Sequence, residues 1–159
     1  MPIPMAINSE PGSGGVAARA PLTLVLDTNI VLDLFVFDDA KSQPLKARLL
    51  DGRLDWLATR PMRDELERVL AYSHIEAWLA RMPIAAPEVL ARFDRHVRLV
   101  DVAQPAPVRC SDPDDQIFID LAVRHQCMLL SKDAAVLKLK NKLAVLQVEV
   151  NAVISPQLS

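Results

Sequence analysis

Four acidic residues stand where strand ends and helix starts are expected: Asp27, Glu65, Asp115 and Asp133. Parallel strands bring their carboxyl ends to one edge of a sheet, where open α/β proteins bind ligands, so we expect these carboxylates to lie together. Carboxylates that close repel one another unless a cation offsets their charge. Hard divalent cations such as Mg²⁺ take oxygen ligands and activate water and phosphodiesters for hydrolysis. The four acids therefore predict a divalent-metal site.

Each acid also has a structural interpretation. Asp27 is a favoured N-cap for the helix expected after it, and Asp133 can cap a helix in the same way, in competition with Ser131. Glu65 flanks the apolar face of its expected helix, where a solvated acid is equally ordinary. No single acid therefore decides between capping and chemistry, and the prediction depends on all of them meeting at one edge.

The segment around the third acid reads Ser111-Asp112-Pro113-Asp114-Asp115-Gln116. Asp112 suits an N-cap, Pro113 the first helical position, and Asp115 the reciprocal place in a capping box. Capping needs one or two acids, and this segment has three in four residues. Asp112 could cap the helix or also reach a metal, and both interpretations remain open.

The elements that must position these acids alternate along the chain. The apolar run at residues 22–26, with β-branched Val25 in its middle, predicts a strand buried on both faces. Further strands are expected at 54–58, 97–102, 127–130 and 145–150, with helices at about 29–37, 44–50, 60–70, 75–81, 87–96, 114–125 and 134–140. Strands and helices in alternation predict an α/β fold with a central, mainly parallel sheet.

Length and composition restrict the protein to one domain. The chain has 159 residues, enough for one well-buried core. Residues 1–20 are rich in Pro, Gly, Ser and Ala and are expected to form a disordered tail, which leaves residues 21–156 as the folded domain. Aromatic residues make up only 4%, which argues against a reader that stacks bases on aromatic rings. The net charge of -2 means that any contact with nucleic acid must use a local basic strip.

Cys110 and Cys127 lack the spacing of a metal or redox motif, which favours two packed thiols in a reducing compartment. No apolar run reaches the length of a membrane span, and no secretory or mitochondrial targeting pattern is present at the start. We therefore expect a cytoplasmic protein without a membrane partner.

Four motifs occur in a fixed order: Asp27-Thr28-Asn29, Glu65 in a Glu-Leu-x-x-Val-Leu helix, Asp-Pro-x-Asp before an apolar helix ending in Ala122, and Ser131-Lys132-Asp133. Together they resemble the PIN domain, and more narrowly the PIN-family toxin components of bacterial toxin–antitoxin systems, over residues 22–156. The resemblance implies a three-layer sandwich around a parallel sheet. It also implies a Mg²⁺- or Mn²⁺-dependent endoribonuclease that acts on RNA, single-stranded or tRNA, with an antitoxin that blocks the site.

Carried over to this chain, the resemblance assigns the family's four metal-binding and catalytic acids to Asp27, Glu65, Asp115 and Asp133, and its accessory polar positions to Asn29 and Ser131. Asp115 is preferred to Asp114 because its spacing to Ala122 fits the family pattern, although the choice between the two stays open. Ala135 stands where relatives often carry a further acid, so the number of metals also stays open.

Lys138, Lys140 and Lys142 form a basic run beside the fourth acid, and Lys132 lies within the last motif. Such a strip could follow a phosphate backbone, while a solvated helix face explains any single lysine equally well. Apolar residues on the helices at 44–50 and 75–90 could serve a homodimer or an antitoxin, although core packing is the simpler explanation.

Two other functions compete with a ribonuclease. A haloacid-dehalogenase-like phosphatase would use Asp27 as a nucleophile, but it needs a second Asp where this chain has Asn29. A non-catalytic PIN-like binding module would use the acids only as caps or as partners of arginines. Dependence on divalent cations separates the nuclease from the binding module.

Overall fold

The computed structural model describes residues 20–154, and its centre is a five-stranded sheet in which every pairing is parallel. The strands are β1 (Leu22–Leu26), β2 (Leu54–Ala58), β3 (Val97–Leu99), β4 (Met128–Leu130) and β5 (Val150–Asn151), and they lie in the order β3-β2-β1-β4-β5. The predicted α/β fold with a parallel sheet is confirmed.

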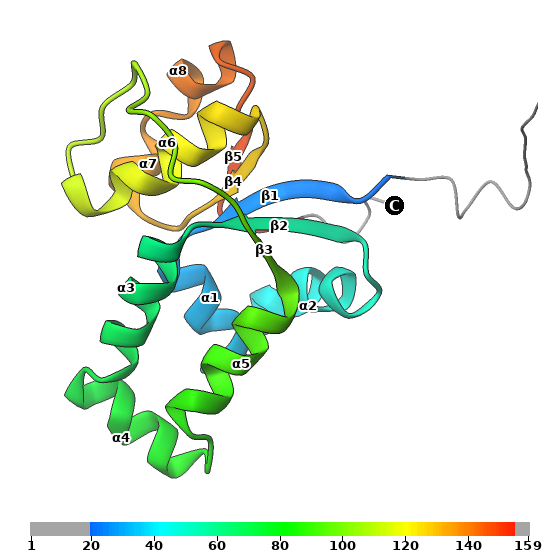
Figure 1. Cartoon of the computed structure of the whole chain (residues 1–159), viewed down its shortest axis with the longest axis vertical. Helices are drawn as coiled ribbons and strands as arrows, with labels where there is room; N and C mark the ends of the chain where they lie inside the picture. The colour runs from blue at the N-terminus through cyan, green and yellow to red at the C-terminus, as the bar shows by residue number, and fades with distance from the viewer. Residues whose placement is uncertain (1–19, 155–159) are drawn as a thin grey trace, which may run out of the picture.

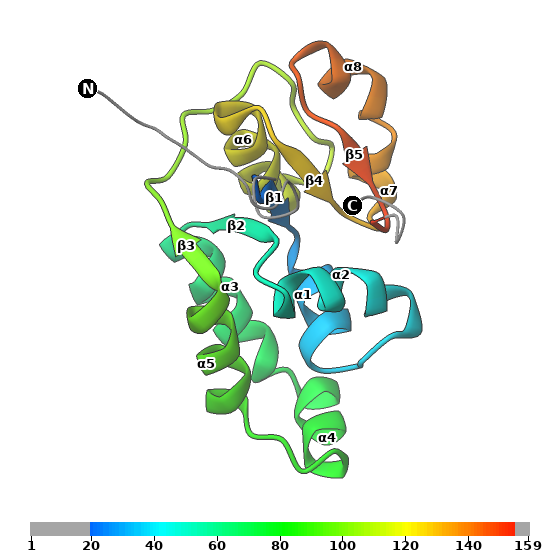
Figure 2. The same ribbon diagram turned by 90° about the vertical axis from the view of Figure 1, so that its right-hand side faces the viewer.

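Helices cover both sides of this sheet. They are α1 (Thr28–Phe35), α2 (Gln43–Leu50), α3 (Arg60–Leu70), α4 (Ser73–Arg81), α5 (Ala86–His96), α6 (Gln116–His125), α7 (Ala134–Leu137) and α8 (Lys140–Val145), with short 3-10 helices η4 (Ala40–Ser42) and η5 (Pro113–Asp115). Figure 1 shows α6, α7 and α8 on one side and α1 to α5 on the other, which makes the expected three layers. In Figures 1 and 2, α4 joins the ends of α3 and α5 that lie farthest from the sheet.

The order of the strands creates a switch point between β1 and β4. From β1 the chain moves outward through β2 to β3, and it then returns to the other side of β1 to form β4 and β5. Connections on the two sides of β1 therefore run in opposite directions, so the helices diverge at the carboxyl ends of β1 and β4. Open α/β sheets bind their ligands at such a place.

The core is built around β1 and its neighbours. Leu24 and Val25 on β1 and Leu129 on β4 are all 0% exposed. Trp56 on β2 is 1% exposed and packs edge to face against Phe93, with ring centroids 5.3 Å apart. Burying these side chains contributes about 1.5–3 kcal/mol each, which makes the centre of the sheet the rigid support for whatever its edge carries.

Two elements near the C-terminus exist but differ from the prediction in their bounds. The strand expected at 145–150 is mostly the end of α8 and a turn, and the strand itself is only Val150–Asn151. Leu139 and Leu143 are buried one helical turn apart and Val145 is 78% exposed, so helical periodicity extends to the end of α8, whereas Val148 and Val150 are buried in alternation on the approach to β5. The helix expected at 134–140 is divided into α7 and α8, which meet at Leu139.

Smaller differences occur elsewhere. The strand expected at 97–102 ends at Leu99, because beyond it only Val100 continues the ladder, through a hydrogen bond from its amide to the carbonyl of Ala58. The tail expected at residues 1–20 lies outside the described residues except for Ala20. Both cysteines are free thiols, as expected, with Cys127 buried and Cys110 partly buried. Within residues 20–154, no helix combines the length and the apolar character that crossing a bilayer requires.

Core packing accounts for most apolar side chains on the helices considered for docking. Leu45 and Leu49 on α2, and Ile75 and Leu79 on α4, belong to the buried core. The larger apolar side chains still exposed along these segments are Leu50, Tyr72 and Met82.

Candidate metal centre

Asp27 lies directly after β1 and is 3% exposed. Its Oδ1 accepts a hydrogen bond from the amide of Ile30 at 2.9 Å, which makes it the N-cap of α1. Its Oδ2 accepts one from Ser131 Oγ at 2.5 Å, across the boundary between β1 and β4. Burial raises the pKa of Asp27 and the charge of Asp133 raises it further, while these hydrogen bonds and Lys132 act in the opposite direction. Asp27 therefore caps α1 and also belongs to an acidic site.

Asp133 lies at the start of α7, after β4. Its Oδ1 accepts a hydrogen bond from the amide of Ala135 at 2.8 Å and so caps α7. Ser131 Oγ accepts one from the amide of Asp133 at 3.1 Å while it donates to Asp27. Ser131 is 0% exposed, and its buried hydroxyl connects the two acids through these two hydrogen bonds.

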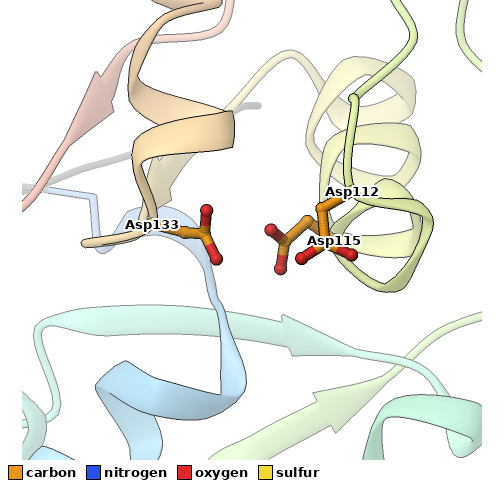
Figure 3. Close-up of side chains that lie close together, drawn as sticks. All are labelled: Asp112, Asp115 and Asp133. Carbon is orange, nitrogen blue, oxygen red and sulfur yellow. The ribbon is translucent and has the colours of Figure 1, made fainter.

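Asp112 and Asp115 approach Asp133 from η5. Asp112 caps η5 by accepting a hydrogen bond from the amide of Asp114 at 3.0 Å. One carboxylate oxygen from each of Asp112, Asp115 and Asp133 lies within 4.8 Å of the other two. Figure 3 shows these three side chains directed toward one another, two from η5 and one from the turn before α7. Asp114 is exposed and lies outside this group, so the geometry favours Asp115 over Asp114 as the third acid.

Asp115 has the most strongly perturbed carboxyl group in this cluster. Burial raises its pKa to about 7, and its contact with Asp133 and the charges of Asp133, Asp112 and Asp27 act in the same direction. Its Oδ2 is buried and, among the described residues, has no hydrogen-bond partner. A buried acceptor without a donor is costly to leave unsatisfied, which points to a ligand that the protein itself does not provide.

Glu65 reaches the same edge from α3 on the other side of α1. It is half-buried, and its Oε1 accepts a hydrogen bond from Thr28 Oγ1 at 2.9 Å. Burial raises the pKa of Glu65, the hydrogen bond from Thr28 lowers it, and Asp114 and Asp112 raise it through their charges. Glu65 and Asp27 are outside the tight group of three, yet they repel its members and so belong to the same acidic edge.

The loop before η5 is tied to α6 by Gln116, which is 7% exposed. Its Nε2 donates hydrogen bonds to the carbonyl of Val108 at 3.0 Å and to Asp120 Oδ1 at 2.8 Å. Its Oε1 accepts one from the amide of Cys110 at 2.6 Å. These bonds hold the loop against α6 and thereby deliver Asp112 to the cluster.

These residues fit a hard divalent cation. All the donors at this edge are carboxylate or hydroxyl oxygens, which Mg²⁺ and Mn²⁺ favour, and within residues 20–154 the acidic cluster includes neither histidine nor cysteine. Repulsion between neighbouring carboxylates contributes to the raised pKa of Asp115. A bound cation would offset this repulsion, which favours binding of the cation. Oδ2 of Asp115 is an acceptor that no described residue uses.

The remaining predicted site residues, Asn29 and the lysines, lie outside the acidic cluster. Asn29 is exposed on the first turn of α1, where its neighbour Thr28 makes the contact with Glu65. Lys138, Lys140 and Lys142 are exposed around α7 and α8, and Lys140 Nζ lies 3.5 Å from Asn151 Oδ1. Lys132 forms an ion pair with Asp33 on α1 while its side chain is 43% exposed, and its contact with RNA stays a prediction.

Three residues of this edge were not assigned from the sequence: Thr28, Asp33 and Gln116. Thr28 stands inside the first motif, so its position was a usable signal. Asp33 contacts Lys132, which is far away in the chain, and a single sequence carries no signal for such a contact. The partners of Gln116 are close in the chain, but they lie in a loop whose conformation the sequence pattern does not predict.

The comparison with protein families agrees with this geometry. The model of the PIN domain family matches residues 23–135, from the start of β1 through the turn that bears Asp133. The chain belongs to the PIN domain family. None of the curated proteins compared matches it.

Proposed function

We propose that this protein is an endoribonuclease that hydrolyses RNA phosphodiesters with Mg²⁺ or Mn²⁺, and that it is the toxin of a toxin–antitoxin pair. The observation that carries the proposal is the group of Asp112, Asp115 and Asp133 at the switch point, with a buried and unpartnered oxygen on Asp115. Membership of the PIN family supports it, because PIN domains are generally nucleases.

In this proposal Asp27, Glu65, Asp115 and Asp133 hold the metal, and Asp112 joins them. A bound divalent cation would supply Lewis-acid activation of water and of the phosphodiester. The protein contributes the orientation: Ser131 fixes the carboxylate of Asp27 and the backbone amide of Asp133, and Thr28 fixes the carboxylate of Glu65. Carboxylates held in this way lose little conformational freedom when the substrate binds. Such positioning lowers the activation barrier of the reaction.

The exposed lysines around α7 and α8 would guide the RNA. Lys138, Lys140 and Lys142 follow Asp133 in the chain and lie on the surface. Lysines that neutralise phosphates make binding weaker as salt concentration rises. The proposal assigns the phosphate backbone to this strip as a whole and no base recognition to any single lysine.

The proposal is tested by cleavage of a panel of single-stranded RNAs and tRNAs. Wild type and Asp27→Asn are compared in Mg²⁺, in Mn²⁺ and in EDTA. Asparagine keeps an oxygen that can accept the hydrogen bond from Ile30, so Asp27→Asn should fold while it loses a negative ligand. We expect cleavage by wild type with either metal, none in EDTA, and a loss of about 100-fold or more in the variant.

Asp39→Asn is the matched control. Asp39 also caps a helix, η4, through a hydrogen bond from the amide of Lys41 at 3.0 Å, but it is not part of the acidic edge. This variant should cleave like wild type. Cleavage that survives EDTA or the Asp27→Asn change would contradict the proposal. Failure to bind Mn²⁺ at all would favour the non-catalytic binding module.

The toxin role needs a cellular readout. Production of the wild-type chain in a bacterial host should arrest growth, whereas Asp27→Asn should not. Co-production of the adjacent gene's product should restore growth if that product is the antitoxin. Growth arrest by both forms would contradict a role for the acidic edge in toxicity.

A further inference from the structure

Asp33 and Lys132 form an ion pair that connects α1 to the turn after β4. The side chain of Asp33 is 10% exposed and that of Lys132 is 43% exposed. Both line a small cavity of about 20 Å³ whose walls combine apolar side chains such as Ile30 and Leu130 with the polar residues Asp39, Lys41 and Ser42. A carboxylate that is largely removed from water is costly unless it has a partner, and Lys132 forms the ion pair with it.

Lys132 stands between the two residues that shape the acidic edge. Before it, Ser131 donates a hydrogen bond to Asp27, and after it Asp133 reaches the group that includes Asp115. The turn is thus attached to α1 at two points, Ser131 to Asp27 and Lys132 to Asp33. Asp33 lies six positions after Asp27 in the chain, which is about 9 Å along a helix.

Two attachments separated along a helix prevent the turn from rotating about either one. We propose that the Asp33–Lys132 ion pair is a positioning element that sets the direction of the Asp133 carboxylate and thereby the affinity of the site for a divalent cation. This inference rests on the proposed function for the metal but also makes a claim about the metal-free turn. It assigns Lys132 to the architecture of the site and not to RNA binding.

The direction in which the affinity for Mn²⁺ changes when Lys132 is removed separates positioning from simple electrostatics. Lys132 is a cation near Asp27, whose pKa it lowers, so its removal by itself should make the edge more negative and bind cations more tightly. If the lysine positions Asp133, its removal should weaken binding instead. The experiment is isothermal titration of Mn²⁺ into wild type and Lys132→Met.

We expect Lys132→Met to weaken Mn²⁺ binding by about tenfold or more, the usual effect of losing a residue that orients a ligand. Lys46→Met is the matched control, because Lys46 is 37% exposed and also pairs with an aspartate, Asp38, at 3.3 Å. That control should stay within about twofold of wild type. Unchanged or tighter binding by Lys132→Met overturns the proposal.

A second variant removes the risk that an unpaired Asp33 unfolds the protein. Asp33→Leu combined with Lys132→Met replaces the pair by apolar groups, an exchange that proteins often tolerate or favour. An apolar contact has no preferred direction, so stability should return while Mn²⁺ binding stays about tenfold weaker or more. Affinity that recovers together with stability overturns the proposal.

Hydrogen exchange supplies a readout without metal. In EDTA, the amides of Asp133 and Ala135 should exchange faster in both Lys132 variants, because their hydrogen bonds define the turn. The same amides should be unchanged in Lys46→Met. Unchanged exchange in the Lys132 variants overturns the proposal. Faster exchange together with no Mn²⁺ binding by wild type would refute the proposed metal function and leave the positioning of the turn supported.

Discussion

Replacing Asp115 with asparagine should stabilise the metal-free protein and at the same time reduce its response to divalent cations. Burial and neighbouring carboxylates raise the pKa of Asp115 from 3.8 to about 7. At about 1.4 kcal/mol per pKa unit, that rise corresponds to about 4 kcal/mol. Asp115 is only partly buried and water screens its charge, so we expect an effect of roughly 1–2 kcal/mol.

The effect depends on pH in a defined direction. A carboxyl group with a higher pKa in the folded protein destabilises that protein above the folded pKa and has no effect below the unfolded pKa. In EDTA, this group should therefore lower wild-type stability as the pH rises from about 4 to about 7, and Asp115→Asn should remove that loss. The amide of asparagine can donate to Asp133 and so replaces repulsion with a hydrogen bond.

The assay is urea denaturation in EDTA at pH values near 5 and near 8, repeated with Mn²⁺. At about 100 times its dissociation constant, a cation should stabilise wild type by about 2.7 kcal/mol, and Asp115→Asn by much less. Asp101→Asn, a change at an exposed loop residue, is the control and should behave like wild type. A variant that is less stable than wild type near pH 8 in EDTA, or equally stabilised by Mn²⁺, would refute the reasoning.

Three further changes test the surroundings of the site. Thr28→Val removes the hydrogen bond to Glu65 and should weaken Mn²⁺ binding about tenfold in a titration. Gln116→Leu leaves partly buried groups of the loop before η5 without partners and should lower the free energy of unfolding by about 1–3 kcal/mol, measured with urea. Lys140→Ala should weaken RNA binding and reduce the slope of log affinity against log salt by about 1, measured by fluorescence anisotropy.

Each of these three predictions has an outcome that would contradict it. Unchanged Mn²⁺ affinity in Thr28→Val would remove Glu65 from the metal-binding group. Wild-type stability in Gln116→Leu would show that the loop does not depend on its hydrogen bonds. A salt slope unaffected by Lys140→Ala would place the RNA on another surface.

The sequence predicted the elements with strong periodicity. The mainly apolar run at 22–26 and the short strand at 54–58 were placed correctly, because a strand whose last three residues are buried allows few alternatives. The last strand, expected at 145–150, begins only at Val150, since a run of valine and leucine suits the end of a helix as well as it suits a strand. Packing, and not local preference, decided between the two.

For the candidate site, the sequence could supply residue types and their order but not their partners. Asp27 and Asp133 were recognisable because each follows a buried strand. Their connection through Ser131, over 104 residues of chain, exists only because β4 lies beside β1. The choice of Asp115 over Asp114 also required the structure, because adjacent residues on a tight helical turn point in different directions.

By itself, the sequence determined that this is an α/β protein with acids at strand ends and helix starts, because apolar periodicity and capping chemistry are local properties of a chain. Only the tertiary structure decided which acids meet, which oxygen is left without a partner, and that Lys132 is held by Asp33. Those facts depend on the strand order, which brings distant segments to the switch point between β1 and β4. Burial there raises the pKa values of Asp27, Glu65 and Asp115, and the repulsion among the acids makes a bound cation favourable.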